Sequence, residues 1–282
     1  MNIYIMTRGR VGRQHTWNAL PDELREKTYI VCPKDEAYLH GQHGIRAAHI
    51  IRSPDWVKNY SDKFKYLVEL DDGNDKAVII DDDLKFSIPK MVYSPSKGNR
   101  QSPIRRLQTV GDQDVSIATG FDYMEHLLDS TALVSFHPRQ MGHTKDAPFV
   151  ENGKVVCVQG INRDLVGHIP DLNRFPILAD VILNATLLER GVGNKLITTL
   201  FIDWYPCQAP GGCSETRTLE MQAEACHWLE ERFGPYIKAV EKEAASGWLG
   251  GKRVDFRGQW KKLYAAGVAG LLDSGTGGDK EA

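Results

Sequence analysis

The sequence predicts an α/β protein whose core is a Rossmann-like, mostly parallel sheet flanked by helices. In the first 80 residues, short apolar runs rich in β-branched residues alternate with longer segments of helical periodicity. A helix between two strands returns the chain across the sheet by a right-handed crossover, so consecutive strands of this kind become parallel. The length of 282 residues is enough for one large domain with a substantial hydrophobic core.

Apolar runs rich in β-branched residues predict the strands of the sheet. Between the first three runs, residues 16–26 and 55–70 are expected to form helices. In the second of these segments the aromatic residues Trp56, Tyr60 and Phe64 recur at helical spacing, which is typical of a helix face that packs in a core. The predicted strands are residues 3–6, 28–31, 77–80, 132–136, 155–158 and 196–201.

The second half of the chain predicts longer loops and a helical C-terminal part. Polar segments at residues 91–110, 137–148 and 162–176, which contain proline or glycine, are expected to be loops. A helix is expected from Asp180 to Arg190, where Gly191 ends it. A longer helix is expected over residues 215–233 and a shorter one from Pro235 to about residue 245. We expect one domain over residues 1–272 and a disordered tail over 273–282.

The composition excludes several classes of protein. The 35 Lys and Arg residues against 37 Asp and Glu residues give a net charge of −2, which excludes a strongly basic nucleic-acid binder, although not a local basic face. The five cysteines form no CxxC pair, which disfavours a zinc ribbon or a disulfide framework and favours the reducing cytoplasm. No apolar run approaches the ~20 residues of a membrane helix, and the N-terminus does not resemble a signal peptide. We therefore expect a cytoplasmic protein without a membrane partner.

Three aspartates, Asp81, Asp82 and Asp83, directly follow the third predicted strand. In open parallel sheets, ligands bind beyond the carboxyl ends of the strands. In an extended segment Asp81 and Asp83 would point to one side, where two carboxylates form a site for Mg²⁺ or Mn²⁺. The alternative is a solvated acidic turn. We favour the metal site because unpaired carboxylates at a strand end repel one another.

The loop Thr7–Arg13 follows the first predicted strand and is expected at the same edge of the sheet. It lacks the GxGxxG pattern, and the chain has no Walker motif, which disfavours NAD and P-loop ATP chemistry. Arg8 and Arg10 are candidates to hold a phosphate or a nucleobase edge, and Arg8 lies closest to the strand end. Solvated surface arginines are the alternative, above all for Arg10 and Arg13.

Two further segments carry candidate site residues. Asp180 opens a predicted helix, either as a catalytic base or as the N-cap that Asp commonly provides. The segment Pro210–Arg217 leads into the longer helix. Its adjacent glycines would let the backbone approach a ligand, and Arg217 would add a positive charge. The alternative is a flexible loop in which Ser214 caps the helix.

Two basic segments are candidates for binding nucleic acid. Cations interleaved with aromatic residues suit a phosphate backbone and exposed bases. For the second segment, a solvated helix face with Trp260 in the core is the alternative. The first segment contains Lys97, Arg100, Arg105 and Arg106, and the second contains Lys252, Arg253, Arg257, Lys261 and Lys262 among Phe256, Trp260 and Tyr264.

Together, these features resemble the GT-A fold of nucleotide-sugar glycosyltransferases. The resemblance rests on the strand end Thr7-Arg8-Gly9-Arg10, the strand end Asp81-Asp82-Asp83-Leu84, and Asp180 at the start of a helix. With the motif Gly-Gly-Cys-Ser-x-x-Arg at residues 211–217, the chain more narrowly resembles phage DNA glycosyltransferases encoded beside ten-eleven-translocation dioxygenases. The similar pieces are Ile3–Arg10, Tyr29–Glu36, Ile79–Phe86, Pro176–Gly191, Gly211–Arg217 and Gln259–Lys262.

The resemblance implies transfer of a sugar from a uridine-diphosphate (UDP) sugar to 5-hydroxymethylcytosine in DNA, in the host cytoplasm if a phage encodes the chain. It implies a nucleotide-sugar half over about residues 1–90 and an acceptor half over about 91–272. The late histidine that often serves GT-A enzymes as a metal ligand is not matched, because His227 lies inside a predicted helix; the loop 206–214 or water would substitute. Two alternatives stay open: a glycosyltransferase for a glycan or small molecule, and a metal-dependent nucleotide or phosphoryl enzyme. The implied roles are Asp81 and Asp83 for Mn²⁺ or Mg²⁺, Thr7, Arg8, Arg10, Asp82 and Arg217 for the donor, Asp180 for the acceptor hydroxyl, and the two basic segments for DNA.

Overall fold

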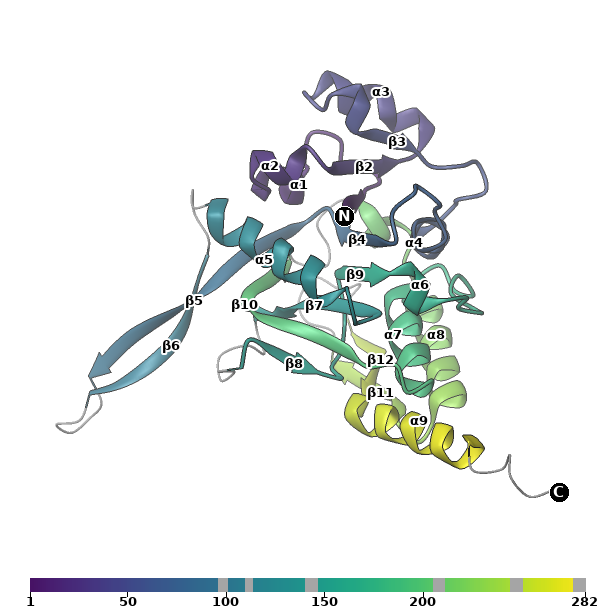
Figure 1. The fold of residues 1–282 in the computed structure, drawn as a ribbon. Coiled ribbons are helices and arrows are strands. Elements are labelled where there is room, and N and C mark those ends of the chain that lie inside the picture. The colour runs from purple at the N-terminus through teal and green to yellow at the C-terminus, as the bar shows by residue number, and fades with distance from the viewer. Residues whose placement is uncertain (96–100, 110–113, 140–146, 205–210, 244–250, 276–282) are drawn as a thin grey trace.

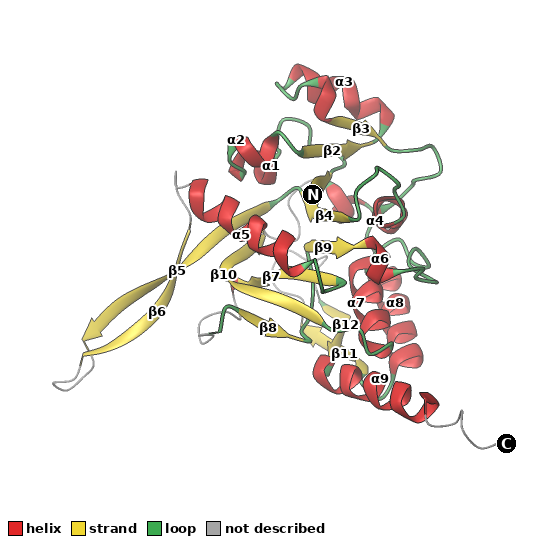
Figure 2. Ribbon diagram, viewed as in Figure 1, coloured by secondary structure: helices red, strands yellow, loops and turns green. Residues whose placement is uncertain are grey.

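The chain forms a mixed α/β structure around one large sheet (Figures 1 and 2). The computed structural model describes residues 1–95, 101–109, 114–139, 147–204, 211–243 and 251–275, with the backbone alone at 90–95, 101–109, 114–116, 214–215 and 273–275. The ten strands of the sheet follow the order β3-β2-β1-β4-β9-β7-β10-β5-β6, and β8 pairs with β10. Most strands run in one direction, and β5, β8 and β9 run against the others.

The N-terminal half confirms the predicted parallel arrangement. β1 pairs in parallel with both β2 and β4, so Met6 lies opposite Val31 on one side and Asp81 on the other. The expected helix at 16–26 is two short helices because Pro21 is extended and interrupts the helical turn. The elements are β1 (Asn2–Met6), α1 (His15–Ala19), α2 (Asp22–Arg25), β2 (Thr28–Cys32), α3 (Lys34–Gln42), η1 (Ala47–His49), β3 (Ile50–Arg52), α4 (Tyr60–Val68) and β4 (Lys76–Asp81).

Two helices of this half differ from the prediction. The polar segment after β2 forms α3, which begins after Pro33 and carries Asp35 and Glu36 in its first turn, a regular helix start. The helix expected at 55–70 covers only α4, because the side chain of Asn59 caps it by accepting a hydrogen bond from the backbone of Asp62. Trp56 therefore precedes the helix and is 50% exposed.

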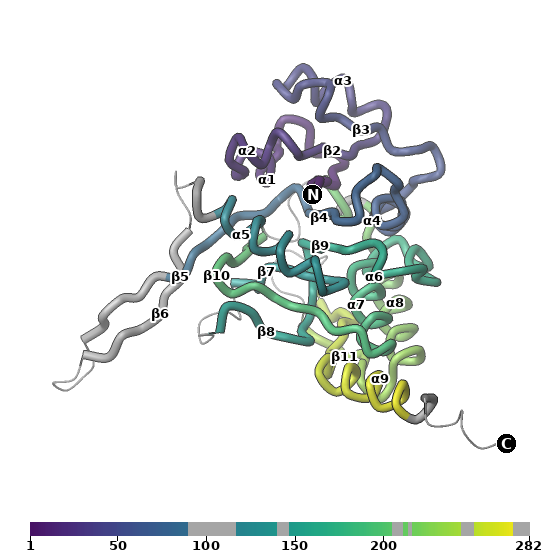
Figure 3. The backbone as a smooth tube through the Cα atoms, in the orientation of Figure 1, coloured from purple at the N-terminus to yellow at the C-terminus, as the bar shows by residue number. Residues whose placement is uncertain are grey.

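The middle of the chain contains more regular structure than predicted. Of residues 91–110, which were expected to be a loop, 91–95 belong to β5 and 101–109 belong to β6, and these two antiparallel strands extend away from the rest of the sheet (Figure 1). Figure 3 shows the preceding part of β5 leaving the sheet beside β10. Its proline Pro103 lies on the edge strand β6, where a missing N–H is tolerated. The remaining elements are β5 (Leu84–Pro95), β6 (Gln101–Thr109), α5 (Asp114–Leu127), β7 (Leu133–Pro138), β8 (Phe149–Glu151), β9 (Val158–Asn162), α6 (Arg163–Val166), α7 (Ala179–Glu189) and β10 (Asn194–Trp204).

The C-terminal part is only partly helical. The long helix ends at Gly234-Pro235 as predicted, but a strand follows instead of a second helix. This strand, β11, pairs with β12, and Ala239 and Phe256 lie opposite each other in the hydrophobic cluster that includes α8. The last helix extends through residues 273–275, which were expected to be disordered, and residues 276–282 lie outside the described part. The elements are η3 (Gly212–Glu215), α8 (Leu219–Phe233), β11 (Ile237–Glu243), β12 (Lys252–Gly258) and α9 (Trp260–Gly275).

Three hydrophobic clusters hold the sheet and its helices together. Alternation along β1 sends Ile3 and Ile5 to one face of the sheet, where α1, α2, α3 and α5 pack. Tyr4 and Met6 point to the other face, which α4, α6 and α7 cover. The third cluster joins α7 to α8, α9 and the β11–β12 pair. Within the described residues, no helix is both long and apolar enough to span a membrane.

Candidate active site

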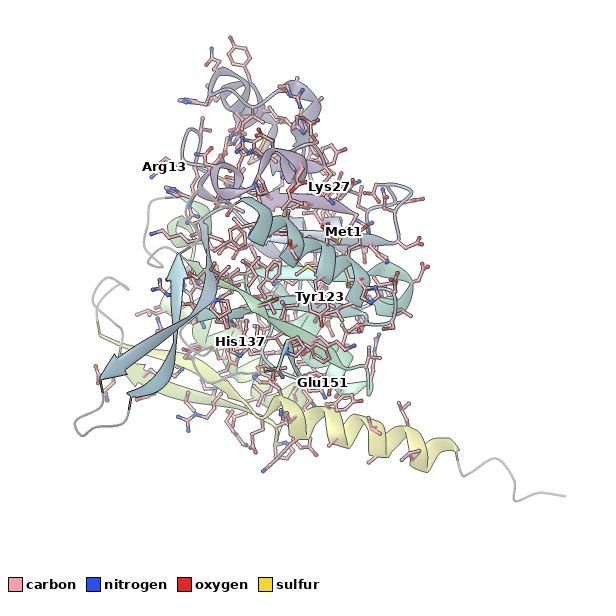
Figure 4. All side chains as sticks on the ribbon, turned by 60° about the vertical axis from the view of Figure 1, so that its left-hand side comes forward. Met1, Arg13, Lys27, Tyr123, His137 and Glu151 are labelled. Carbon is pink, nitrogen blue, oxygen red and sulfur yellow. The ribbon has the colours of Figure 1, made fainter. Side chains whose placement is uncertain are left out.

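A pocket of about 340 Å³ lies at the carboxyl ends of β1 and β4. Its wall includes all the residues that the sequence assigns to the metal, the donor and the acceptor hydroxyl. They come from four segments that are far apart in the sequence, and the first is the loop after β1, which Arg13 marks in Figure 4. The predicted residues in the pocket wall are Thr7, Arg8, Arg10, Asp81, Asp82, Asp83, Asp180 and Arg217.

The aspartate triplet is fixed by hydrogen bonds to the start of α1. The buried Thr16 donates from its hydroxyl to the carbonyl of Asp81 (2.6 Å) and from its backbone N–H to the carbonyl of Asp82 (3.1 Å). The same hydroxyl accepts the N–H of Leu84 (2.9 Å). The triplet is therefore an ordered turn between β4 and β5, and the alternative of a solvated acidic turn is wrong.

Arg10 is buried and binds two of these aspartates. Its Nη1 forms ion pairs with Asp82 and with Oδ2 of Asp83, the latter at 2.7 Å. Asp82 and Asp83 form a turn and are not extended, so both side chains reach the same guanidinium. The prediction that Asp82 and Asp83 point to opposite sides is therefore wrong. The alternative of a solvated arginine is excluded for Arg10. The positive charge of Arg10 neutralises negative charge on Asp82 and Asp83 within the protein.

The carboxylate of Asp81 lies in a negatively charged part of the pocket. Burial raises its pKa well above the usual range, and repulsion from Asp83 and Asp180 raises it further. Burial also raises the pKa of Asp180, while the positive charges of Lys154 and Arg217 lower it. Because Asp83 and Asp180 repel the carboxylate of Asp81, a cation bound at Asp81 would be favoured.

Asp180 lies in the first turn of α7 but does not cap the helix. The N-cap position belongs to Leu178, which has a φ of +68° and makes no side-chain capping bond. The backbone N–H groups of Val181 and of Asp180 itself, in the first turn, lower the pKa of the Asp180 carboxylate against the effect of burial. The N-cap interpretation is therefore wrong, and the helix start holds this carboxylate in the pocket.

The glycine pair in residues 211–217 packs against the loop after β1. Gly212 donates its N–H to the carbonyl of Arg8 (2.8 Å), and a Cβ at Gly211 would lie 2.5 Å from Cγ of Arg10. The close approach predicted for these glycines is thus made to the protein itself. Thr218, and not Ser214, caps α8, because its hydroxyl accepts the N–H of Met221 (3.1 Å).

Several pocket residues were missed by the sequence analysis. Lys63 is buried beneath the loop after β1, donates to the carbonyls of Thr7 and Val31, and has its pKa lowered to about 8 by burial. A lysine three residues after Tyr60, on the apolar side of the predicted helix, was the signal that could have identified it. Tyr60, Lys154 and Trp204 also line the pocket.

Cys157 is a further pocket residue without a clear sequence signal. Its φ is +63°, which is uncommon for a residue other than glycine, and it is the reason why the strand predicted at 155–158 begins only at Val158. The carbonyl of Cys157 accepts the backbone N–H of Asp81 at 3.0 Å. Strained backbone of this kind clusters at functional sites. Here it lies against Asp81, the first aspartate of the triplet.

Within the part of the chain whose side chains are described, neither basic segment contributes a residue to the pocket wall. Arg100 and Lys97 fall outside the described residues, and Arg105 and Arg106 lie on β6, where only the backbone is described. The second segment is the strand β12 followed by the first turn of α9, so the interpretation as a helix face is wrong for residues 252–258. The exposed cations of this second segment are Lys252, Arg257, Lys261 and Lys262, while Arg253 is half-buried and pairs with Asp255 at 3.4 Å.

Lys154 connects the pocket with β12. It lines the pocket, and its Nζ lies 4.4 Å from the centre of the Phe256 ring on β12. Along this strand the charged residues alternate with Val254 and Phe256, which pack toward α8. Lys154 therefore brings β12 to the edge of the pocket through Phe256, a residue on the apolar side of that strand.

The pocket offers part of a ligand set for a divalent metal. Among the described residues, no group of three His, Cys, Asp or Glu side chains is arranged to hold a metal ion. Asp81 and Asp83 offer two carboxylates, and Mg²⁺ typically takes one or two carboxylates together with phosphate oxygens and water. The residues thus fit a metal that binds together with a phosphate ligand. His227 is exposed on α8 and does not line this pocket.

Comparisons with known proteins add no assignment to this geometry. The chain matches no protein-family model, and no curated protein matches it in sequence. A functional conclusion therefore depends on the pocket itself and on the resemblance carried by its motifs.

Proposed function

We propose that the protein is a metal-dependent glycosyltransferase that moves a sugar from a UDP-sugar to 5-hydroxymethylcytosine in DNA. One observation carries the proposal: the residues assigned to donor, metal and acceptor from sequence motifs all line one pocket. That pocket lies at the carboxyl ends of parallel strands, where nucleotide ligands bind in open α/β sheets.

The donor side of the pocket combines fixed carboxylates with positive charge. When bound by Asp81 and Asp83, a divalent ion would neutralise the charge that develops on the departing diphosphate. Arg10 keeps the side chains of Asp82 and Asp83 in one orientation through its ion pairs. Arg8 is exposed at the edge of the pocket and donates to the carbonyl of Lys58, which holds its guanidinium near the position of a diphosphate.

Asp180 acts as the general base. The acceptor hydroxyl forms a bond to the anomeric carbon, the bond from that carbon to the diphosphate breaks, and the hydroxyl proton moves to Asp180. Burial raises the pKa of Asp180, which makes its carboxylate a better proton acceptor, while Lys154 and Arg217 lower the pKa in part. A base in a duplex reaches such a pocket only when it is flipped out of the stack.

DNA binds to exposed cations next to the acceptor side. Lys252, Arg257 and the lysines at the start of α9 are exposed, and Lys154 brings the β12 strand to the edge of the pocket. Phosphate contacts of this kind give affinity that falls with salt and carries no sequence information.

The decisive experiment is mass spectrometry of nucleosides from hydroxymethylated DNA incubated with the protein, Mn²⁺ and a panel of nucleotide sugars. The expected product is 5-hydroxymethylcytosine heavier by one sugar, and its formation should stop with EDTA. DNA with unmodified cytosine is the matched control. Absence of the product with every sugar nucleotide, while the protein remains folded, would contradict the proposal.

A glycosyltransferase for a glycan or small acceptor is the second candidate. It is favoured by the acids that pair with the cations of the β11–β12 strands: Asp255 contacts Lys242 at 2.9 Å and Arg253 at 3.4 Å. Such pairing reduces the positive charge available to DNA. Release of UDP with small acceptors, but not with hydroxymethylated DNA, would favour this candidate.

A further inference from the structure

Lys63 is a buried cation for which the described structure provides no paired anion. Its side chain is only 5% exposed, yet it belongs to the wall of the pocket. Among the residues that the structure describes, no carboxylate lies within ion-pair distance of its Nζ. Buried charges are costly unless they are paired, so an unpaired ammonium in a pocket wall needs an explanation.

The hydrogen bonds of Lys63 fix its position but leave its charge uncompensated. An ammonium has three donors, and here two of them bind backbone carbonyls, those of Thr7 and Val31. These bonds join the carboxyl ends of β1 and β2. The third N–H has no partner among the described residues, so it is available to a ligand in the pocket.

The carboxylates of Glu36 and Asp82 act on Lys63 from beyond ion-pair distance, and each has another partner. Glu36 on α3 accepts the N–H of Gly9 at 2.9 Å and lies beside His40, and Asp82 is paired with Arg10. Cys32 on β2 has its pKa raised by burial to about 11, so its thiol carries no charge to neutralise the lysine. Arg8 adds a second positive charge on this side of the pocket.

We infer that Lys63 completes a binding site for an anionic phosphate group, with a diphosphate of a nucleotide as the ligand. The pocket wall contains the cations Arg8, Lys58 and Lys63 as well as the carboxylates Asp81, Asp83 and Asp180, so a phosphate could be held by the cations and by a metal bound to the carboxylates. The inference rests on the proposed function for the identity of the nucleotide, whereas the phosphate chemistry follows from Lys63 alone. Lys63 was not among the residues assigned from sequence.

The test is calorimetry of UDP, pyrophosphate and uridine binding in EDTA, with wild type, Lys63→Met and Lys63→Gln. Loss of a charge-assisted hydrogen bond should weaken UDP and pyrophosphate binding by about 10- to 100-fold in both variants. Uridine, which has no phosphate, should bind as in wild type. Gln keeps donors for the two carbonyls, so it separates loss of charge from loss of the strand-joining bonds. Lys65→Met, on the same helix but outside the pocket wall, is the matched control.

Proton linkage gives a readout that a structural role would not change. The pKa of Lys63 is about 8 without ligand, and a bound phosphate would raise it, so binding at pH 8 should take up about half a proton. Binding enthalpies in two buffers measure this uptake, and both Lys63 variants should lack it. Cys32, Glu36, Asp82 and Arg8 face the same ammonium. Burial raises the pKa of Cys32 to about 11 and that of Asp82 above its usual value, whereas hydrogen bonds from His40 and Gly9 outweigh burial and lower the pKa of Glu36.

The outcomes separate this inference from the proposed function. Equal UDP affinity in wild type and Lys63→Met, within about twofold, would overturn the inference and leave the sugar transfer untouched. Equal loss of uridine and UDP would also overturn it, because it would indicate a distorted pocket. Pyrophosphate binding that depends on Lys63, without UDP binding, would support the phosphate site and argue against the UDP-sugar donor.

Discussion

The two halves of the molecule contribute to the pocket in different ways. The N-terminal half supplies Thr7, Arg8 and the aspartates from the ends of adjacent parallel strands, so regular backbone pairing brings them together. The C-terminal half supplies Asp180 from a helix start and Arg217 from an irregular segment, and these are brought in by packing against the first half. The pocket thus has a regular side, set by the sheet, and an irregular side, set by tertiary contacts.

The largest effect is expected from the irregular side, at Asp180. Asp180→Asn removes the proposed general base but keeps the shape of the side chain, so transfer should slow by about 10²- to 10⁴-fold. Donor binding, to which Asp180 is not assigned, should stay within about twofold of wild type. Rates of sugar transfer and calorimetry of UDP binding measure the two effects, with the exposed Asp164→Asn as control. An active Asp180→Asn protein would mean that this carboxylate only stabilises the helix start.

The difference between the halves also explains what the sequence could predict. Asp81, Asp82 and Asp83 follow a buried parallel strand, and the carboxyl ends of parallel strands meet at one edge, so their location followed from local pattern alone. The ion pairs of Arg10 could not be predicted, because they require the turn at Asp82 and Asp83 and the nearby chain of Gly211. These are long-range contacts without a local signature.

The C-terminal strands were missed for a related reason. Residues 237–243 were assigned to a helix from Pro235 onward, but β11 forms because β12 pairs with it and α8 covers its apolar side. The hairpin β5–β6 was hidden by its prolines, which normally argue against a central strand but are compatible with an edge. Strand formation in this half depends on pairing with segments that are distant in sequence, and the strand propensity of a single segment carries no information about such pairing.

The contact between the two halves can be broken at Gly211. Its φ of +96° and the 2.5 Å approach to Arg10 mean that Gly211→Ala adds both backbone strain and a collision. We expect the free energy of unfolding to fall by about 2–4 kcal/mol. Gly41→Ala is the control, because Gly41 lies in α3 with open space around it and should gain about 0.5–1 kcal/mol. Chemical denaturation measures both, and equal effects would contradict the close packing of residues 211–212.

A smaller effect on stability is expected from the regular side, at Asp81. The pKa of Asp81 is higher in the folded chain than in the unfolded chain. At a pH between these two pKa values, the folded chain binds more protons than the unfolded chain, so the folded chain loses stability as the pH rises through that range. Asp81→Asn lacks this loss, so in EDTA its melting temperature should exceed that of wild type at pH 7. The difference should shrink toward pH 4, where both states bind the proton. Thermal unfolding across this range measures it, and a variant that is less stable at pH 7 would show that Asp81 is held by favourable contacts.

The smallest effect is expected outside the pocket, where the two halves differ in exposed cations. Arg257 on β12 is exposed in the C-terminal half, whereas Lys34 on α3 is exposed in the N-terminal half and pairs with Asp55 at 2.7 Å. If β12 contacts DNA phosphates, Arg257→Ala should reduce the slope of log affinity against log salt by about 1, with little change between DNA sequences. Lys34→Ala should leave the slope unchanged.

Titrations of hydroxymethylated duplex at several salt concentrations measure the slopes. An equal slope for Arg257→Ala and wild type would remove β12 from the DNA surface while leaving the pocket chemistry intact, because Arg257 does not line the pocket.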